Sequence, residues 1–226
     1  MKNNNFQISL LVQALAVILL YACNNQTQKD KEPTIVKSSD SPVVKKKEPT
    51  EAPLPSNRPP IINITDTLSV KRLVLCMKDS AANFDRISLK LGQIYGVKLA
   101  TVIKKNNLKV TGQPMAWYKA RKAPYFFEAG IPVDKRPRKL PANAFVKEIG
   151  VDSVIVAHFY GGYDLLPQAY EALTDVIKDR KLTLKAKPYE IYTDDPIDKD
   201  GKLKDPYKVQ TDVVFPWKSV KATDPR

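Results

Sequence analysis

From residue 69 onward, the hydrophobic and polar positions switch between strand-like and helix-like spacing. A branched apolar run over 70–77 predicts a strand, and apolar residues at helical spacing predict a helix over 82–106, which Gly96 interrupts. Two more strands are predicted over 113–119 and 125–133. A basic, proline-bearing loop follows, so this first unit reads strand, helix, strand, strand.

The same order of elements returns in the second half of the chain. A buried run predicts a strand over 151–160, and an apolar stripe predicts a helix over about 163–180, with Pro167 in its first turn. Strands over 187–193 and 208–217 complete the second unit. We therefore predict an α+β domain of duplicated βαββ units with pseudo-twofold symmetry and a mostly antiparallel sheet.

Direct self-similarity supports the duplication. At an offset of 74, residues 99–118 align with 173–192 without a gap, and seven of the twenty pairs are identical. Pro114 with Pro188 and Tyr118 with Tyr192 are among them. A seam between two such halves is a common place for a small-molecule site.

Residues 1–68 differ in composition from the rest. An apolar run over 10–21 is shorter than a membrane span and predicts the core of a signal peptide over 1–22. Residues 23–68 are rich in Pro, Ser, Thr and Lys without any aromatic residue, which predicts a disordered tether. We expect the domain over 69–217 and a C-terminal tail over 218–226.

Cys23 is the predicted attachment point to a membrane. The sequence Leu20-Tyr21-Ala22-Cys23 resembles the bacterial lipobox, with Tyr as an unusual middle residue. The resemblance implies cleavage before Cys23 and lipidation, with palmitate as one acyl group, in the cell envelope. Asn24 favours the outer membrane, facing the periplasm or the surface. A plain secretory signal or an anchor helix is the alternative.

Charge and cysteine content narrow the partners and the chemistry. The formal net charge is +13, which favours anionic partners, but export would separate the protein from nucleic acid, which we do not expect to be bound. The basic runs 119–122 and 135–139 are interpreted as solvated loops or, alternatively, as a patch facing lipid headgroups. Cys76 is expected to be a buried hydrophobe. One His and one further Cys predict no zinc site, and we expect no cofactor.

Two of the predicted strands place aromatic residues around one carboxylate. Side chains alternate along a strand, so Glu190 and Tyr192 share a face, and the repeat adds Ala116 and Tyr118 to it. On the seam, this face would form an aromatic-walled pocket that suits a cationic or planar ligand. A solvated Glu190 beside ordinary tyrosine pairs is the alternative. The predicted ligand-binding residues are Ala116, Trp117, Tyr118, Tyr163, Tyr170, Glu190 and Tyr192.

Motifs of the second unit resemble the GyrI-like effector-binding domain, which occurs in multidrug-sensing regulators and in stand-alone small-molecule-binding proteins. The motifs are Gly161-Gly162-Tyr163-Asp164 with Leu166, Ala169, Tyr170 and Leu173, then Pro188-x-Glu190-x-Tyr192 with Asp195-Pro196, then Thr211-Asp212-Val213 before Pro216. The resemblance covers about 69–217. It implies a pocket between two βαββ halves, with Glu190 facing the ligand. Some members hydrolyse strained electrophilic rings with the equivalent Glu.

The chain departs from that family pattern in places. His158 stands one residue further back than the family histidine, and Gly162 replaces a Pro, so we interpret His158 as structural. Without a predicted helix-turn-helix before the domain, we expect neither direct control of transcription nor gyrase inhibition. Glu128 and Asp212 are repeat mates and would form a catalytic pair only if they converge. We expect a structural role for both.

Three functions remain open on the sequence. The favoured one is a membrane-tethered lipoprotein that captures an amphipathic, aromatic or cationic small molecule, with no catalytic residue. The second is a hydrolase in which Glu190 activates water against an electrophilic ligand. The third is an envelope protein-interaction module with a vestigial pocket and a basic docking face.

Overall fold

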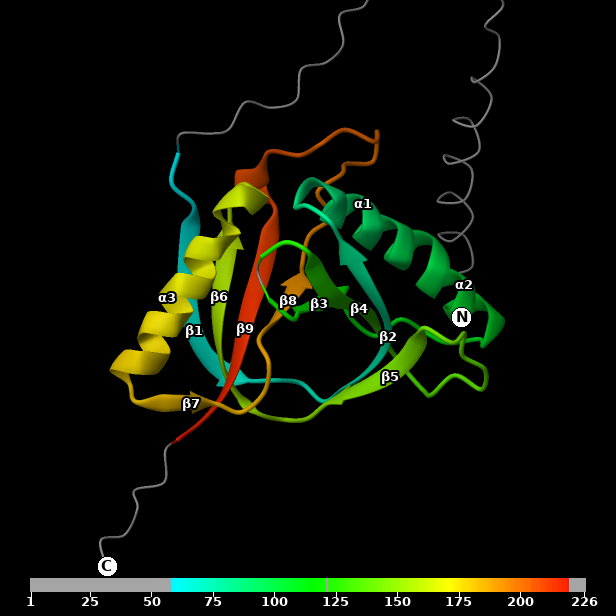
Figure 1. Ribbon diagram of the computed structural model, residues 1–226, viewed down its shortest axis with the longest axis horizontal. Helices are drawn as coiled ribbons and strands as arrows, with labels where there is room; N and C mark the ends of the chain where they lie inside the picture. Colours follow the sequence, from blue (N-terminus) through cyan, green and yellow to red (C-terminus); the bar gives the residue numbers. More distant parts are fainter. Residues whose placement is uncertain (1–57, 121, 220–226) are drawn as a thin grey trace, which may run out of the picture. The chain divides into compact units, whose positions relative to one another are not determined.

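Residues 58–120 and 122–219 are described by the computed structural model of the protein (Figure 1). The predicted signal peptide, Cys23, most of the tether and the end of the tail lie outside the described residues. Those expectations therefore stay predictions. Among the described residues, no helix is both long and apolar enough to cross a membrane.

Strands form the centre of the molecule. Eight of them follow the order β1-β6-β9-β8-β3-β4-β2-β5, β7 pairs with β9, and every pairing is antiparallel. Their bounds are β1 Ile61–Leu68, β2 Arg72–Ala81, β3 Met115–Tyr118, β4 Tyr125–Val133, β5 Ala144–Ile149, β6 Ser153–Tyr160, β7 Leu182–Leu184, β8 Tyr189–Tyr192 and β9 Gln210–Ser219.

Two helices cover one face of this sheet. The first runs through α1 (Asp85–Gln93), a π-helical segment η1 (Ile94–Leu99) and α2 (Ala100–Lys105), and packs its apolar stripe on β2 and β4. The second, α3 (Leu166–Asp179), follows the short η2 (Tyr163–Leu165) and packs on β6 and β9. A further apolar cluster, which includes Cys76 and Met115, lies on the opposite face of the sheet.

The predicted duplication is confirmed. The first unit is β2, the helix pair, β3 and β4, and the second is β6, α3, β8 and β9. The sheet order reads the same from both ends, with β3 beside β8 at its centre. The pseudo-twofold axis therefore passes between these two strands, and an α+β domain with an antiparallel sheet results, as the sequence predicts.

The tether was predicted to extend to residue 68, but residues 61–68 form β1, and the predicted loop between the units contains β5. β1 precedes the first unit but pairs with β6 of the second unit. In the same way, β5 precedes the second unit but pairs with β2 of the first. The sequence did not indicate β1 because it is an edge strand in which seven of the eight residues are exposed, and its apolar residues do not alternate regularly with polar ones. The short β7 was also missed.

Between Ile94 and Leu99, the first helix contains one residue more than the matching stretch of α3. Leu99 matches Leu173 at the repeat offset of 74, whereas the buried Ile94 and the half-buried Tyr95 match Ala169 and Tyr170 at an offset of 75. The offset changes within the π-helical segment, which also contains Gly96. A π-helical turn accommodates one additional residue in a helix, so Tyr95 becomes the structural counterpart of Tyr170.

The role of β1 can be tested with two neighbouring isoleucines. Ile62→Ala is expected to lower the free energy of unfolding by about 1–2 kcal/mol, because Ile62 packs against the cluster under α3. Ile61→Ala is expected to change it by less than about 0.5 kcal/mol, since Ile61 is 41% exposed. Urea denaturation of the full chain measures both. Equal, negligible effects would contradict a structural role for β1.

Candidate functional site

The two units meet where Ala116 on β3 pairs with Glu190 on β8. These residues are repeat mates as well as register partners, so the pseudo-twofold axis passes through this pair. One side of the axis carries a methyl group and the other carries a carboxylate. The two halves therefore differ in chemistry at the position through which the symmetry axis passes.

The Glu190 carboxylate is buried and held by two phenols. Its side chain is 2% exposed. The Tyr170 hydroxyl on α3 donates to Oε1 at 2.9 Å, and the Tyr192 hydroxyl on β8 donates to Oε2 at 2.8 Å. Hydrogen bonds to a charged acceptor are the stronger kind, so this pair fixes the position of the carboxylate.

Two further tyrosines from the first unit complete the cluster. Tyr118 and Tyr192, mates in the repeat, place their hydroxyls 3.1 Å apart. Tyr95, the counterpart of Tyr170, donates to the Met115 carbonyl at 2.8 Å, since Ala116 offers it no carboxylate. The Tyr95 ring also lies edge-on to Tyr192, with centroids 6.2 Å apart.

Burial keeps the phenols of Tyr95, Tyr163 and Tyr192 protonated. It raises the pKa of Tyr95 and of Tyr192 well above the usual value, and the nearby Glu190 charge raises both further. The pKa of Tyr163 is raised by burial and by Glu190 and Asp195, against a hydrogen bond from Thr211 that lowers it. These groups therefore remain neutral hydrogen-bond donors at neutral pH.

A cavity of about 650 Å³ opens above Glu190, between α1 and the segment that follows β8. Its walls are mostly aliphatic and aromatic side chains. The charged residues that line it are Glu190, Asp194 and Asp195, and none of its described lining residues is Lys, Arg or His. The described part of the cavity lining thus carries acidic side chains and no basic one, within a chain whose net charge is +13.

The structure places most of the predicted site residues at this cavity. Tyr118, Tyr163, Glu190 and Tyr192 line it, and Tyr170 lies behind Glu190 as a hydrogen-bond donor. Ala116 faces the same side of the sheet but is fully buried in the core.

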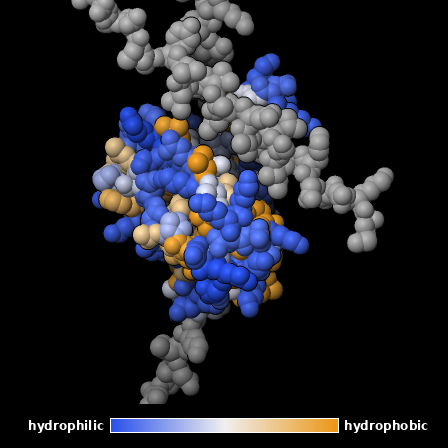
Figure 2. Space-filling view, turned by 90° about the vertical axis from the view of Figure 1, so that its right-hand side faces the viewer, coloured by the Kyte–Doolittle hydropathy of each residue, from blue (hydrophilic) through white to orange (hydrophobic). Residues whose placement is uncertain are grey.

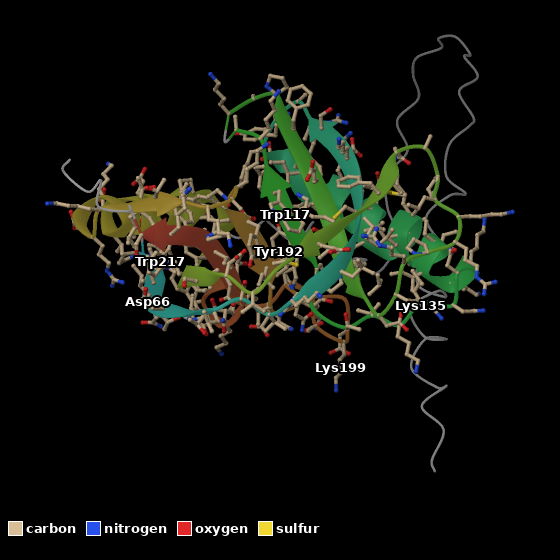
Figure 3. All side chains as sticks on the ribbon, turned by 90° about the horizontal axis from the view of Figure 1, so that it is seen from below. Asp66, Trp117, Lys135, Tyr192, Lys199 and Trp217 are labelled. Atoms are coloured by element: carbon tan, nitrogen blue, oxygen red, sulfur yellow. The ribbon has the colours of Figure 1, made fainter. Side chains whose placement is uncertain are left out.

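The structure corrects the predicted position of Trp117. It belongs to the opposite face, where its ring lies 5.5 Å from that of Tyr189 and 4.1 Å from the Lys147 ammonium. Alternation along β3 requires this, because Ala116 and Tyr118 point toward the cavity. Trp117 and Tyr192 are labelled in Figure 3.

Several cavity residues were not predicted. Tyr95 was assigned only to the core stripe of its helix, and the one-residue shift of the repeat conceals its match to Tyr170. Phe84 and Tyr125 pack edge-on at the mouth, with centroids 6.3 Å apart. Ile197 and Leu203 come from the polar segment after β8, where sequence periodicity carries no signal.

Other candidate residues have structural partners away from the cavity. His158 contacts Asp212 at 2.8 Å and Thr65 at 3.0 Å, which links β1, β6 and β9. Glu128 pairs with Lys147. Two strands separate β4 from β9, so Glu128 and Asp212 lie three strand spacings of roughly 4.8 Å apart and do not converge.

Cys76 is fully buried, and burial raises the pKa of its thiol to about 12. Within the part of the chain that the structure describes, no group of three or more His, Cys, Asp or Glu side chains is placed to hold a metal ion.

The basic run 135–139 lies outside the cavity lining. Asn106 at the end of α2 binds it, since its Oδ1 accepts hydrogen bonds from the backbone of Arg138 and Lys139 at 2.9 and 3.1 Å. Figure 2 shows that the end of the domain with α2 is hydrophilic over much of its described surface. A role in facing lipid headgroups stays a prediction.

Comparison with solved structures identifies the fold of the chain. No family model matches the chain, and no curated protein matches it. The C-terminal domain of EcmrR matches with a TM-score of 0.59 and 18% identity, over 71% of this chain and 99% of that domain. The chain has the GyrI-like fold. EcmrR in a complex with DNA gives a TM-score of 0.59 and 21% identity over 70% of this chain, which spans 58% of the EcmrR chain.

Tyrosine ionisation tests the burial of this cluster. A raised pKa in the folded state means that the contribution of Tyr192 to stability is fully present below pH about 10 and is lost as the pH rises through the folded pKa. The free energy of unfolding is therefore expected to fall above pH about 10, less steeply in Tyr192→Phe.

Tyrosinate absorbance gives an independent measurement. At pH about 10, where a solvent-exposed tyrosine is half ionised, the folded wild type and Tyr192→Phe should absorb equally. In urea, by contrast, the variant should lack the contribution of one tyrosine. If the folded variant absorbs less tyrosinate light than the folded wild type at that pH, Tyr192 ionises normally in the native state.

Proposed function

We propose that the protein binds a small amphipathic molecule with a positively charged group in the cavity between its two units, and that a lipid anchor at Cys23 holds it in the bacterial cell envelope. The observation that carries the binding proposal is the buried Glu190 carboxylate in an apolar cavity whose described lining includes three acids and no base.

Desolvation explains why such a site attracts a cation. A buried carboxylate is costly unless hydrogen bonds and opposite charge compensate for lost water. Tyr170 and Tyr192 supply two of its hydrogen bonds. A ligand cation in the cavity would add opposite charge near the carboxylate, and the faces of nearby tyrosines would add cation–π attraction.

The size and lining of the cavity indicate the rest of the ligand. A volume of about 650 Å³ lies within the range of small-molecule sites, about 300–1,000 Å³. Leu91, Leu166 and Phe84 contribute apolar surface that would bury an aliphatic or aromatic body. An amphipathic organic cation therefore matches both the apolar walls of the cavity and the Glu190 carboxylate at its floor.

Two probes of matched shape and opposite charge test the proposal. Tetraphenylphosphonium is expected to bind the wild type, and Glu190→Gln is expected to weaken binding at least about tenfold, because the ion pair is lost. Glu128→Gln removes the same charge outside the cavity and should bind like the wild type. Tetraphenylborate should show no dependence on Glu190. Calorimetric titration measures each dissociation constant.

The remaining outcomes separate the alternatives. If Glu190→Gln leaves tetraphenylphosphonium binding unchanged, the cationic site is wrong. Conversion of an electrophilic ligand by the wild type but not by Glu190→Gln would identify a hydrolase. Failure of all cationic probes, together with binding of an envelope protein, would favour an interaction module.

The lipid anchor is tested separately. In bacterial cells grown with an alkyne-bearing palmitate analogue, the wild type is expected to become labelled and to sediment with membranes. Cys23→Ser should lose both properties. Cys76→Ser is the matched control, because Cys76 is fully buried and its thiol has a pKa raised to about 12. Label retained in Cys23→Ser would refute the anchor.

A further inference from the structure

A second cavity, of about 210 Å³, lies where β2 and β3 end and β4 begins. Of its described lining residues, Tyr118 is the one that it shares with the first cavity. In the sheet register, Glu128 on β4 stands between Lys78 on β2 and Trp117 on β3. These three side chains belong to the face of the sheet opposite the helices. The second cavity is therefore separate from the site described above.

The acids that line this cavity already have basic partners. Asp79 pairs with Lys90, with the carboxylate and ammonium 2.8 Å apart. Glu128 pairs with Lys147, whose ammonium also lies 4.1 Å from the centroid of the Trp117 ring. Neither carboxylate is therefore left to neutralise the other charged residues of the lining.

Those other charged residues are three exposed lysines, Lys78, Lys119 and Lys187. Within residues 58–120 and 122–219, none of the three forms an ion pair with an acid. The Lys78 ammonium lies 5.2 Å from the centroid of the Phe145 ring, which offers it a weak attraction but no negative charge. The described lining consequently has a surplus of positive charge.

The register of the seam brings two of these lysines together. Ala116 pairs with Glu190, and the same register continued by three residues places Lys119 opposite Lys187. Both side chains line the second cavity. Like charges directly opposite each other in an antiparallel pair are destabilising. An anion held between the two ammonium groups would replace this repulsion by two attractions.

An aromatic side chain stands beside the lysines. Phe126 lines the same cavity and is 51% exposed. It is the neighbour of Lys119 across the β3–β4 pair, since the Lys119 amide donates to the Phe126 carbonyl at 2.8 Å. An exposed ring offers a flat apolar surface on which another ring can pack. The volume is below the range of about 300–1,000 Å³ for drug-sized ligands, so it suits a molecule of one or two rings.

We infer that the second cavity binds a small aromatic carboxylate, with the acid group between Lys119 and Lys187 and the ring on Phe126. Lys78 adds positive charge at the same cavity. The inference does not rest on the proposed function, because no residue that carries that proposal takes part in it. The two cavities would then bind ligands of opposite charge.

The test compares 2-naphthoate with 2-naphthamide, which share the ring system and differ in charge. The full chain is titrated by calorimetry at low ionic strength, where exposed charges are least screened. The wild type is expected to bind 2-naphthoate at least about three times more tightly, as expected for two exposed ion pairs. Lys119→Gln/Lys187→Gln should lose this preference and keep the wild-type affinity for the amide. Phe126→Ala should weaken the binding of both probes, because the ring contact is lost.

Lys199→Gln/Lys202→Gln is the matched control, because it removes the same two charges from residues that line neither cavity. Both lysines belong to the hairpin over 194–205, in which Ile197 and Leu203 form a bridge. Lys199 lies well away from Trp117 in Figure 3. The control variant should retain the wild-type preference for 2-naphthoate.

Four results would overturn the inference. They are equal affinities or no binding of the two probes in the wild type, a preference that survives in Lys119→Gln/Lys187→Gln, its loss in the control variant, and unchanged binding in Phe126→Ala. None of these results bears on the first cavity, whose test is the binding of tetraphenylphosphonium to the wild type and to Glu190→Gln.

Discussion

The antiparallel pairing of β3 with β8 is the contact on which the rest of the structure depends. It joins the two units into one sheet, and only two register pairs, Met115 with Ile191 and Ala116 with Glu190, form it. Around this short seam, four tyrosines from both halves exchange hydrogen bonds and ring contacts. The seam is therefore also the floor of the cavity, and changes to the site act directly on the contact between the units.

Three departures from symmetry all reach the cavity. Glu190 stands opposite Ala116, the additional residue of the π-helical segment lies beside Tyr95, and the hairpin over 194–205 covers one side. The repeated elements supply the rigid frame, since their helices pack on the same face of the sheet. The unrepeated parts supply the chemistry, which is consistent with a site built on rigid elements and specialised by local changes.

Periodicity and self-similarity were sufficient to predict the duplicated units, because each unit buries a clear apolar stripe. They also placed Glu190, Tyr118 and Tyr192 on one face, since alternation along a strand assigns faces, and the resemblance to the GyrI-like domain favoured a ligand pocket there. They failed where burial is weak or local: β1 is an exposed edge strand, and the segment 194–205 has no hydrophobic period. Tyr95 was missed because a single added residue shifts the repeat, which a comparison at fixed offset cannot detect.

The asymmetry at the axis follows from electrostatics. Side chains directly opposite each other in an antiparallel pair have Cβ atoms about 4.5–5.5 Å apart, and like charges there are destabilising. A second Glu at position 116 would put two buried carboxylates at that separation, and one would be forced to take a proton. A twofold scaffold therefore accommodates a buried carboxylate at this pair more readily when the mate is not a second acid. Ala116 is neutral and small, so it makes the single charge of Glu190 possible and leaves space beside it.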